Sequence, residues 1–138
     1  MYLLHWESSS LYRKYSGRID WRELEKSVIE GHANFRMDSV RFVINDFLDC
    51  ESVEFNAESI EELAARSSIN EKINPRYSVA FVVTNPDVKS VVDAYLAIGL
   101  TKAPTRYFST VEEALAWQQY PPISIGNASY LMTTAVPE

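Results

Sequence analysis

The segment from Thr105 to Trp117 constrains the fold most, because it joins a short strand to a capped helix. Residues 105–108 are rich in β-branched and aromatic side chains, as strands are. Ser109 follows as a helix-capping residue, and Glu112 lies three positions later, at the spacing of a capping box. The apolar residues after the cap recur at helical spacing: they are Val111, Ala114, Leu115 and Trp117. The segment predicts one strand–helix unit.

Further strands are predicted upstream of this unit. Tyr2–Trp6 and Leu11–Tyr15 are rich in aromatic and aliphatic residues and flank a polar turn, which predicts an antiparallel hairpin. Val40–Ile44 is a short apolar run that is typical of a strand buried on both faces. Val79–Val83 has the same character and predicts a central strand.

Helices are predicted between these strands. Each begins after a residue that favours the helix N-cap, and apolar side chains then recur with helical periodicity. The three capping residues are Asp20, Asn56 and Asn85. Gly31 and Gly99 are natural helix stops, and the middle helix is expected to fade near Asn70.

This alternation predicts parallel, right-handed crossover connections. We therefore expect an α/β fold with a mixed sheet of about five strands, in which the N-terminal hairpin is followed by parallel crossovers. Four helices should pack mainly on one side of the sheet. Residues 1–120 would form one domain, and residues 45–55 would be an irregular acidic loop. The tail, residues 121–138, is too apolar to be dismissed as disorder, and we expect it either to add a strand or to pack on a partner subunit.

Charge and composition exclude several classes of protein. The chain has 138 residues and a formal net charge of −6, with no Lys/Arg cluster, which argues against nucleic-acid and anionic-membrane partners. Its apolar runs are far shorter than the ~20 residues of a membrane helix, and its start lacks signal-peptide features. The single cysteine, Cys50, excludes an internal disulfide. We expect a cytoplasmic protein.

Candidate chemistry gathers after the predicted strand at residues 40–44. Asp46, Asp49 and Glu51 lie where ligands of open α/β sheets bind, so the cluster could form a metal or phosphoacceptor site. A receiver domain would place an aspartate here, but its other acidic and lysine residues are missing. The more ordinary interpretation is a solvated acidic loop. The helix start at Asn85 could offer backbone N–H groups to an anion, although Asp87 in the same turn would oppose one.

Other chemistry-bearing residues give no catalytic pattern. His5 and His32 lie in different elements, and neither has a second ligand at metal spacing. Cys50 would be an exposed loop residue that its acidic neighbours keep as an inert thiol. The chain has neither a glycine-rich phosphate loop nor a nucleophile elbow. We therefore expect no enzyme activity, no metal and no cofactor.

Four segments, taken in order and spacing, resemble the SpoIIAA-like family of small bacterial proteins, which is related to STAS domains (sulfate transporter and anti-sigma-factor antagonist). The segments are Gly17–Leu24 (GRIDWREL), Val40–Asp46 (VRFVIND), Ser78–Val83 (SVAFVV) and Arg106–Trp117 (RYFSTVEEALAW). The resemblance spans residues 2–118. It implies a mixed sheet with helices mainly on one side, and action by binding partners rather than by catalysis.

One family feature is missing. Regulatory STAS proteins carry a phosphorylatable serine in an Asp-Ser-Ser-Gly type of segment after the third strand. The corresponding place here, Asp46–Cys50, has no serine, threonine or glycine. The phosphorylation role is not transferred to Ser52 or Ser59, which are near in sequence.

The main functional hypothesis is a non-enzymatic regulatory module that binds a protein partner and forms a homodimer. The residues expected to contact a ligand or partner are Asp46, Asp49, Ser52 and Asn85. One alternative is a small apolar-ligand binding protein, with a pocket between helices and sheet lined by the N-terminal aromatic residues. A second is a metal-dependent enzyme that uses the acidic loop.

Overall fold

The computed structural model describes residues 1–119, and within them one mixed sheet has five strands in the order β1-β2-β3-β4-β5. β1 pairs antiparallel with β2, and every later neighbour is parallel. The predicted hairpin and parallel crossovers are therefore confirmed. The strands are β1 (Tyr2–Trp6), β2 (Ser10–Ile19), β3 (Phe42–Val53), β4 (Ser78–Val82) and β5 (Thr105–Phe108).

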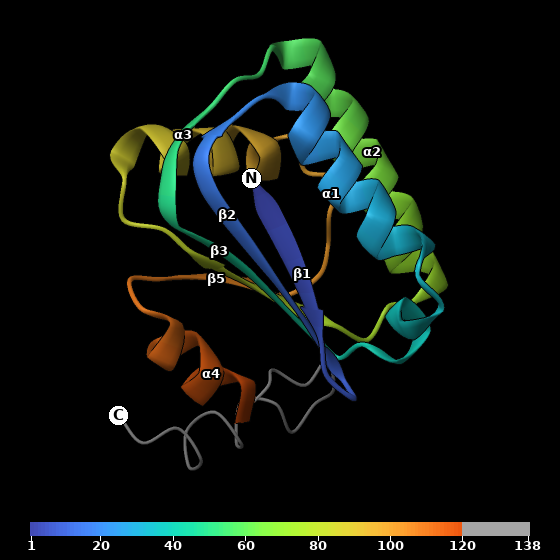
Figure 1. Cartoon of the computed structure of the whole chain (residues 1–138). Helices are drawn as coiled ribbons and strands as arrows, with labels where there is room; N and C mark the ends of the chain where they lie inside the picture. Colours follow the sequence, from blue (N-terminus) through green and yellow to red (C-terminus); the bar gives the residue numbers. More distant parts are fainter. Residues whose placement is uncertain (120–138) are drawn as a thin grey trace.

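Four α-helices lie within the described residues, and three of them cover one face of the sheet (Figure 1). These three are α1 (Trp21–Ala33), α2 (Ala57–Ile73) and α3 (Pro86–Ala97). α4 (Val111–Gln119) packs on the opposite face, and a short 3-10 helix, η1 (Phe35–Ser39), follows α1. The prediction of four helices mainly on one side is confirmed. The predicted packing of the tail falls on residues 121–138, outside the described residues.

The two faces of the sheet have different contents. Side chains alternate along a strand, so Leu11, Arg13 and Tyr15 of β2 lie on the face that α1, α2 and α3 cover. There Tyr15 stacks on Phe47 with ring centroids 4.6 Å apart, inside the largest apolar cluster of the described residues. Trp117 of α4 is buried on the other face against β3 and β4. It is a core residue.

The predicted N-caps of α1, α2 and α3 are confirmed. Their side-chain oxygens accept hydrogen bonds from backbone N–H groups of the first turn. The cap of α4 was predicted one residue too early: Thr110 Oγ1 accepts from Glu113 N at 3.1 Å, and Glu113 reaches back to Ser109 N. In this register Ala114 and Trp117 are buried and Leu115 is 47% exposed.

The predicted acidic loop was wrong, because residues 45–53 belong to β3, which runs from Phe42 to Val53. The segment contains no glycine or proline that would end the strand, and its apolar members Phe47 and Cys50 point into the core. The register of its pairing with β2 shifts at two places, one of them between Lys14 and Ser16. Such bulges interrupt the alternation without ending the strand, which is why the sequence looks irregular here.

Candidate functional site

Asp46 is a buried strand residue on the α4 face of the sheet, with 3% of its surface exposed. Its Oδ2 accepts a hydrogen bond from the Tyr12 hydroxyl. Its Oδ1 accepts from Leu48 N at 2.9 Å, next to the first register slip. Bulges leave backbone groups outside the ladder, so Asp46 supplies the acceptor that Leu48 N needs. Burial, and then the Asp46 hydrogen bond, raise the pKa of Tyr12 and keep its hydroxyl a donor.

Asp49 lies in a different environment. Its side chain is 59% exposed and forms an ion pair with Lys14, with 3.1 Å between Oδ2 and Nζ. The two aspartates thus bind separate partners and do not converge on one point. Among the described residues, no group of three or more His, Cys, Asp or Glu side chains is arranged to hold a metal ion.

We expect Asp46→Asn to lower the free energy of unfolding by about 1–2 kcal/mol, because the amide cannot accept both buried hydrogen bonds. Asp49→Asn should change it by less than about 0.5 kcal/mol, since it breaks only an exposed ion pair. Urea unfolding of both variants measures this difference. Equal losses would show that Asp46 has no special role in the strand.

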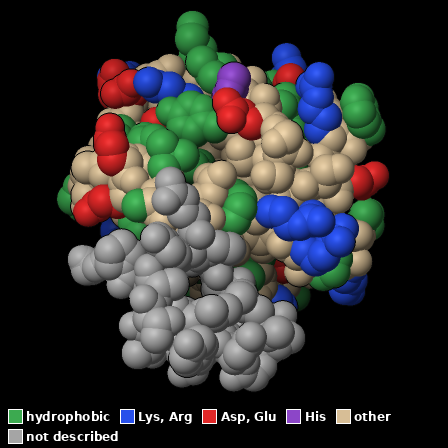
Figure 2. Space-filling view, turned by 90° about the horizontal axis from the view of Figure 1, so that it is seen from below, with side chains coloured by type: hydrophobic (Ala, Val, Ile, Leu, Met, Phe, Trp, Pro, Cys, Tyr) green, Lys and Arg blue, Asp and Glu red, His purple; other side chains and the backbone are tan. Residues whose placement is uncertain are grey.

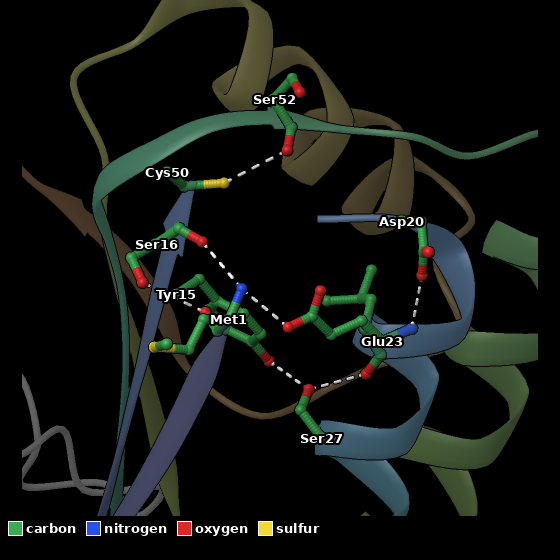
Figure 3. Close-up of polar contacts among 9 residues, drawn as sticks. Met1, Tyr15, Ser16, Asp20, Glu23, Ser27, Cys50 and Ser52 are labelled. Atoms are coloured by element: carbon green, nitrogen blue, oxygen red, sulfur yellow. Dashed lines mark hydrogen bonds and ion pairs between the residues drawn. The ribbon is translucent and has the colours of Figure 1, made fainter. Parts of the chain in front are cut away.

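Asn85 and Ser52 lie near the end of β3. Asn85 Nδ2 donates to the carbonyl of Glu51 at 3.1 Å, so the N-cap of α3 also connects to β3. The Ser52 carbonyl accepts from the Cys50 thiol at 3.5 Å (Figure 3). The hydrogen bonds of the described residues do not join Asp46, Asp49, Ser52 and Asn85 into one cluster. Their role in partner binding stays a prediction.

Cys50 is buried in β3, with 3% of its surface exposed, so its predicted place in an exposed loop was wrong. Burial is the main factor that raises the pKa of its thiol. A protonated thiol in the core is a weak nucleophile.

The start of α1 is tied to the strands by polar contacts (Figure 3). The Met1 amino group binds the Glu23 carboxylate at 2.7 Å and the Ser16 carbonyl at 2.9 Å. The Tyr15 hydroxyl lies 2.6 Å from Ser27 Oγ, which in turn donates to the Leu24 carbonyl. These contacts hold α1 against β2, and each atom named here has a hydrogen-bond or ion-pair partner.

Arg13 is different, because it is buried and only partly bonded. Its residue is 5% exposed, and Nη1 donates to Asn45 Oδ1 at 3.2 Å. Nε and Nη2 have no hydrogen-bond partner among residues 1–119. The guanidinium packs against Gly31 of α1, where an added Cβ would lie 2.6 Å from Nη2. Gly31 is therefore not the predicted helix stop, since α1 continues to Ala33 and the glycine makes room for Arg13.

The guanidinium lines two adjoining cavities between the sheet and the helices, within the described residues. Their volumes are about 80 Å³ and about 50 Å³. The residues that line both are Arg13, His32, Asn45, Ser67, Phe81 and Tyr95. A pocket in this place was one of the alternatives from the sequence, but a site for a drug-sized ligand has roughly 300 Å³ or more.

Sequence reasoning missed this site, although a signal was present. Leu11, Arg13 and Tyr15 alternate along β2, and the first and last are apolar residues that point into the core. The middle residue of such a triplet must share their face. A charged residue there indicates a buried cation.

His32 lines the same cavities and stays neutral. Burial lowers its pKa to about 3, and the nearby guanidinium groups of Arg13 and Arg66 contribute to this shift. At neutral pH the imidazole therefore adds no charge, and Arg13 is the cation of the larger cavity.

Figure 2 shows one side of the outer surface. Acidic and basic side chains both occur there, with apolar side chains between them (Figure 2). Within residues 1–119, every helix is too short or too polar to span a membrane.

Comparison with known proteins gives a fold. No protein-family model matches the chain, and no curated protein matches it. Among solved structures, the anti-sigma factor antagonist SpoIIAA in its unphosphorylated form matches with a TM-score of 0.60 and 12% identity, over 86% of this chain and 98% of that one.

Two further structures agree. An anti-sigma factor antagonist from Mycobacterium paratuberculosis has a TM-score of 0.58 and 19% identity, over 83% of this chain and 90% of that one. A STAS domain protein from Planctomyces limnophilus has a TM-score of 0.55 and 21% identity, over 85% and 97%. The chain has the SpoIIAA-like STAS fold, as the sequence resemblance implied.

Proposed function

We propose that this protein is a non-enzymatic regulatory module of a bacterial cytoplasm that acts by binding another protein. The observation that carries the proposal is the likeness to anti-sigma factor antagonists over more than four fifths of the chain. The identities of 12% and 19% do not transfer a partner. We therefore propose binding to another protein as the mode of action, without naming the partner.

Exposed apolar side chains on α1, η1 and α2 support it. Ile69 and Ile73 are 60% and 70% exposed, and their spacing of four residues puts them on one face of α2. Phe35 of η1 is 80% exposed, and Ile29 of α1 is 39% exposed. α1 and α2 are neighbours, as an ion pair between Arg66 and Glu25 at 4.0 Å indicates. We call these four residues the helix surface.

Partner binding in this proposal does not use a phosphoserine switch at the family position. SpoIIAA has been solved in unphosphorylated and phosphorylated forms. Asp46–Cys50, which the sequence indicated as that position, lies inside β3; the strand ends at Val53, and the connection to α2, residues 54–56, has no serine or threonine. The next serine, Ser59, is 3% exposed, and its hydroxyl is engaged with Asn56 in the capping box of α2.

The experiment compares the wild-type protein with an Ile69→Asp, Ile73→Asp variant as bait in lysate of the source cell. Leu115→Asp is the control, since it also replaces an exposed apolar residue by aspartate, on α4 across the sheet, although it adds one negative charge where the double variant adds two. We expect a protein that the wild type and the control recover and the double variant does not. Recovery that is equal for all three baits, or absent for all, would contradict binding at the helix surface.

Self-association belongs to the same proposal, with a homodimer as the expected state. Light scattering at micromolar concentration should give a mass near twice that of one chain. A mass equal to that of one chain would contradict the homodimer but not the binding of a different protein. Tyr2 of the N-terminal hairpin packs against the core of its own chain.

The alternative function, binding of an apolar ligand, is limited by the volume of the cavities. Cavities of about 80 Å³ and about 50 Å³ lie where that hypothesis placed a pocket. They are too small for a drug-sized ligand, so only a much smaller molecule fits.

A further inference from the structure

Arg13 is a buried cation that keeps its positive charge in the folded protein. An arginine side chain stays protonated in proteins, and Arg13 is 5% exposed. No ion pair joins it to a carboxylate in the described part of the chain. A buried charge without a counter-charge is costly, so this guanidinium calls for an anion.

The free donors have a specific geometry. Nη1 donates to Asn45, whereas Nε and Nη2 have no hydrogen-bond partner among the described residues and are fully buried. Nε and Nη2 are the two nitrogens on one side of the guanidinium, and together they form the side-on fork that binds both oxygens of a carboxylate. A planar acceptor with two oxygens therefore matches the free donors better than a spherical ion does.

The cavity wall around the fork sets the size and polarity of the rest of the ligand. The described residues that line the larger cavity include no Asp or Glu, and most of them are apolar, among them Phe47, Val88 and Val92. Glu71 lines only the smaller cavity, and its Oε1 accepts from Lys102 N and Ala103 N. An anion is therefore favoured in the larger one. Its volume, about 80 Å³, is below the ~150 Å³ that accepts benzene.

We propose that the larger cavity binds a short aliphatic monocarboxylate of about two to four carbons. Its carboxylate accepts hydrogen bonds from Arg13 Nε and Nη2 once the guanidinium turns toward the cavity that it lines, and its alkyl end contacts the apolar wall at Phe47, Val88 and Val92. His32 and Ser67 line the same cavity and offer further polar groups to the ligand. This site goes beyond the proposed protein-binding function and does not depend on it.

The test is a calorimetric and NMR titration of the full chain with sodium propionate, at constant ionic strength set with sodium chloride. We expect saturable binding to the wild type and at least tenfold weaker binding to Arg13→Met. Sodium phosphate should not compete at equal concentration. If Arg13→Met does not fold, Gly31→Ala serves instead: its methyl group would displace Nη2, and we expect at least threefold weaker binding.

A second comparison tests the alkyl end. Val92→Leu enlarges a side chain of the cavity wall, so it fills part of the cavity and leaves Arg13 intact. We therefore expect this variant to weaken butyrate binding more than acetate binding. The proposal is overturned if the folded wild type shows no saturable signal, which would mean that water alone solvates the guanidinium. It is also overturned if phosphate competes as well as propionate, or if a folded Arg13→Met binds propionate as the wild type does.

Discussion

We expect the Arg13→Met, Asn45→Leu double variant to be more stable than the wild type by about 1–4 kcal/mol in the free energy of unfolding. Replacing buried ionic groups by apolar side chains of similar volume is often neutral or stabilising by this amount. Here the reason is specific, because Arg13 has two free nitrogens among the described residues and one hydrogen bond, to Asn45. The second substitution is needed because methionine alone would leave the Asn45 oxygen buried without its donor.

Chemical denaturation of the double variant measures the effect. Arg18→Met is the control, since the Arg18 side chain is 86% exposed and should change stability by less than about 0.5 kcal/mol. Saturating propionate should stabilise the wild type and leave the double variant unchanged. A double variant less stable than the wild type would identify Arg13 as a structural residue.

Acid should weaken the fold through His32. Its pKa in the folded protein is about 3, below its ordinary value of 6.5. Between these values the unfolded chain binds a proton that the folded chain does not, so the free energy of unfolding falls as pH falls through this range. At pH 4.5 the loss from this group is about 2–3 kcal/mol. Above pH 7 the group contributes nothing, because it is neutral in both states.

Unfolding of the wild type and of His32→Gln at pH 7 and at pH 4.5 isolates this contribution, because both proteins share the titration of their carboxylates. The variant should lose about 2–3 kcal/mol less than the wild type between the two pH values. His5→Gln, which changes an exposed histidine that lies 3.0 Å from Glu7, should behave as the wild type does. Identical pH dependence in His32→Gln and wild type would contradict a neutral imidazole in the folded protein.

Much of the fold could be predicted from local signals. Asp20, Asn56 and Asn85 marked helix starts because a capping side chain acts within one turn. The parallel crossovers followed from the alternation of strands and helices. The sequence failed where a rule depends on register: β3 continues through two slips, so Asp46 and Asp49 looked like a loop although one is buried and the other exposed.

The candidate site was harder to predict, because its parts are distant in sequence. Arg13 becomes a buried cation only because Gly31, on the next helix, leaves room for it and Asn45, on the next strand, binds one nitrogen. Each residue alone has an ordinary interpretation: a polar strand position, a helix stop and a loop residue. The contact that joins them is tertiary, so no local pattern contains it.

The proposed protein-binding surface and the buried cation lie in different places. The helix surface faces outward on α1, η1 and α2, and the cation lies beneath the same helices, against the sheet. A small carboxylate under α1 and a protein on its outer surface could therefore bind independently or influence one another. Repeating the bait comparison with and without propionate distinguishes these cases.

The most direct test of the buried-cation account is a crystal structure of the wild-type protein grown in sodium propionate. The account predicts a carboxylate with one oxygen within hydrogen-bond distance of Arg13 Nε and the other within that distance of Nη2. Its alkyl end should lie against Val88 and Val92. A guanidinium surrounded only by water at saturating propionate, or paired with Glu71, would contradict it.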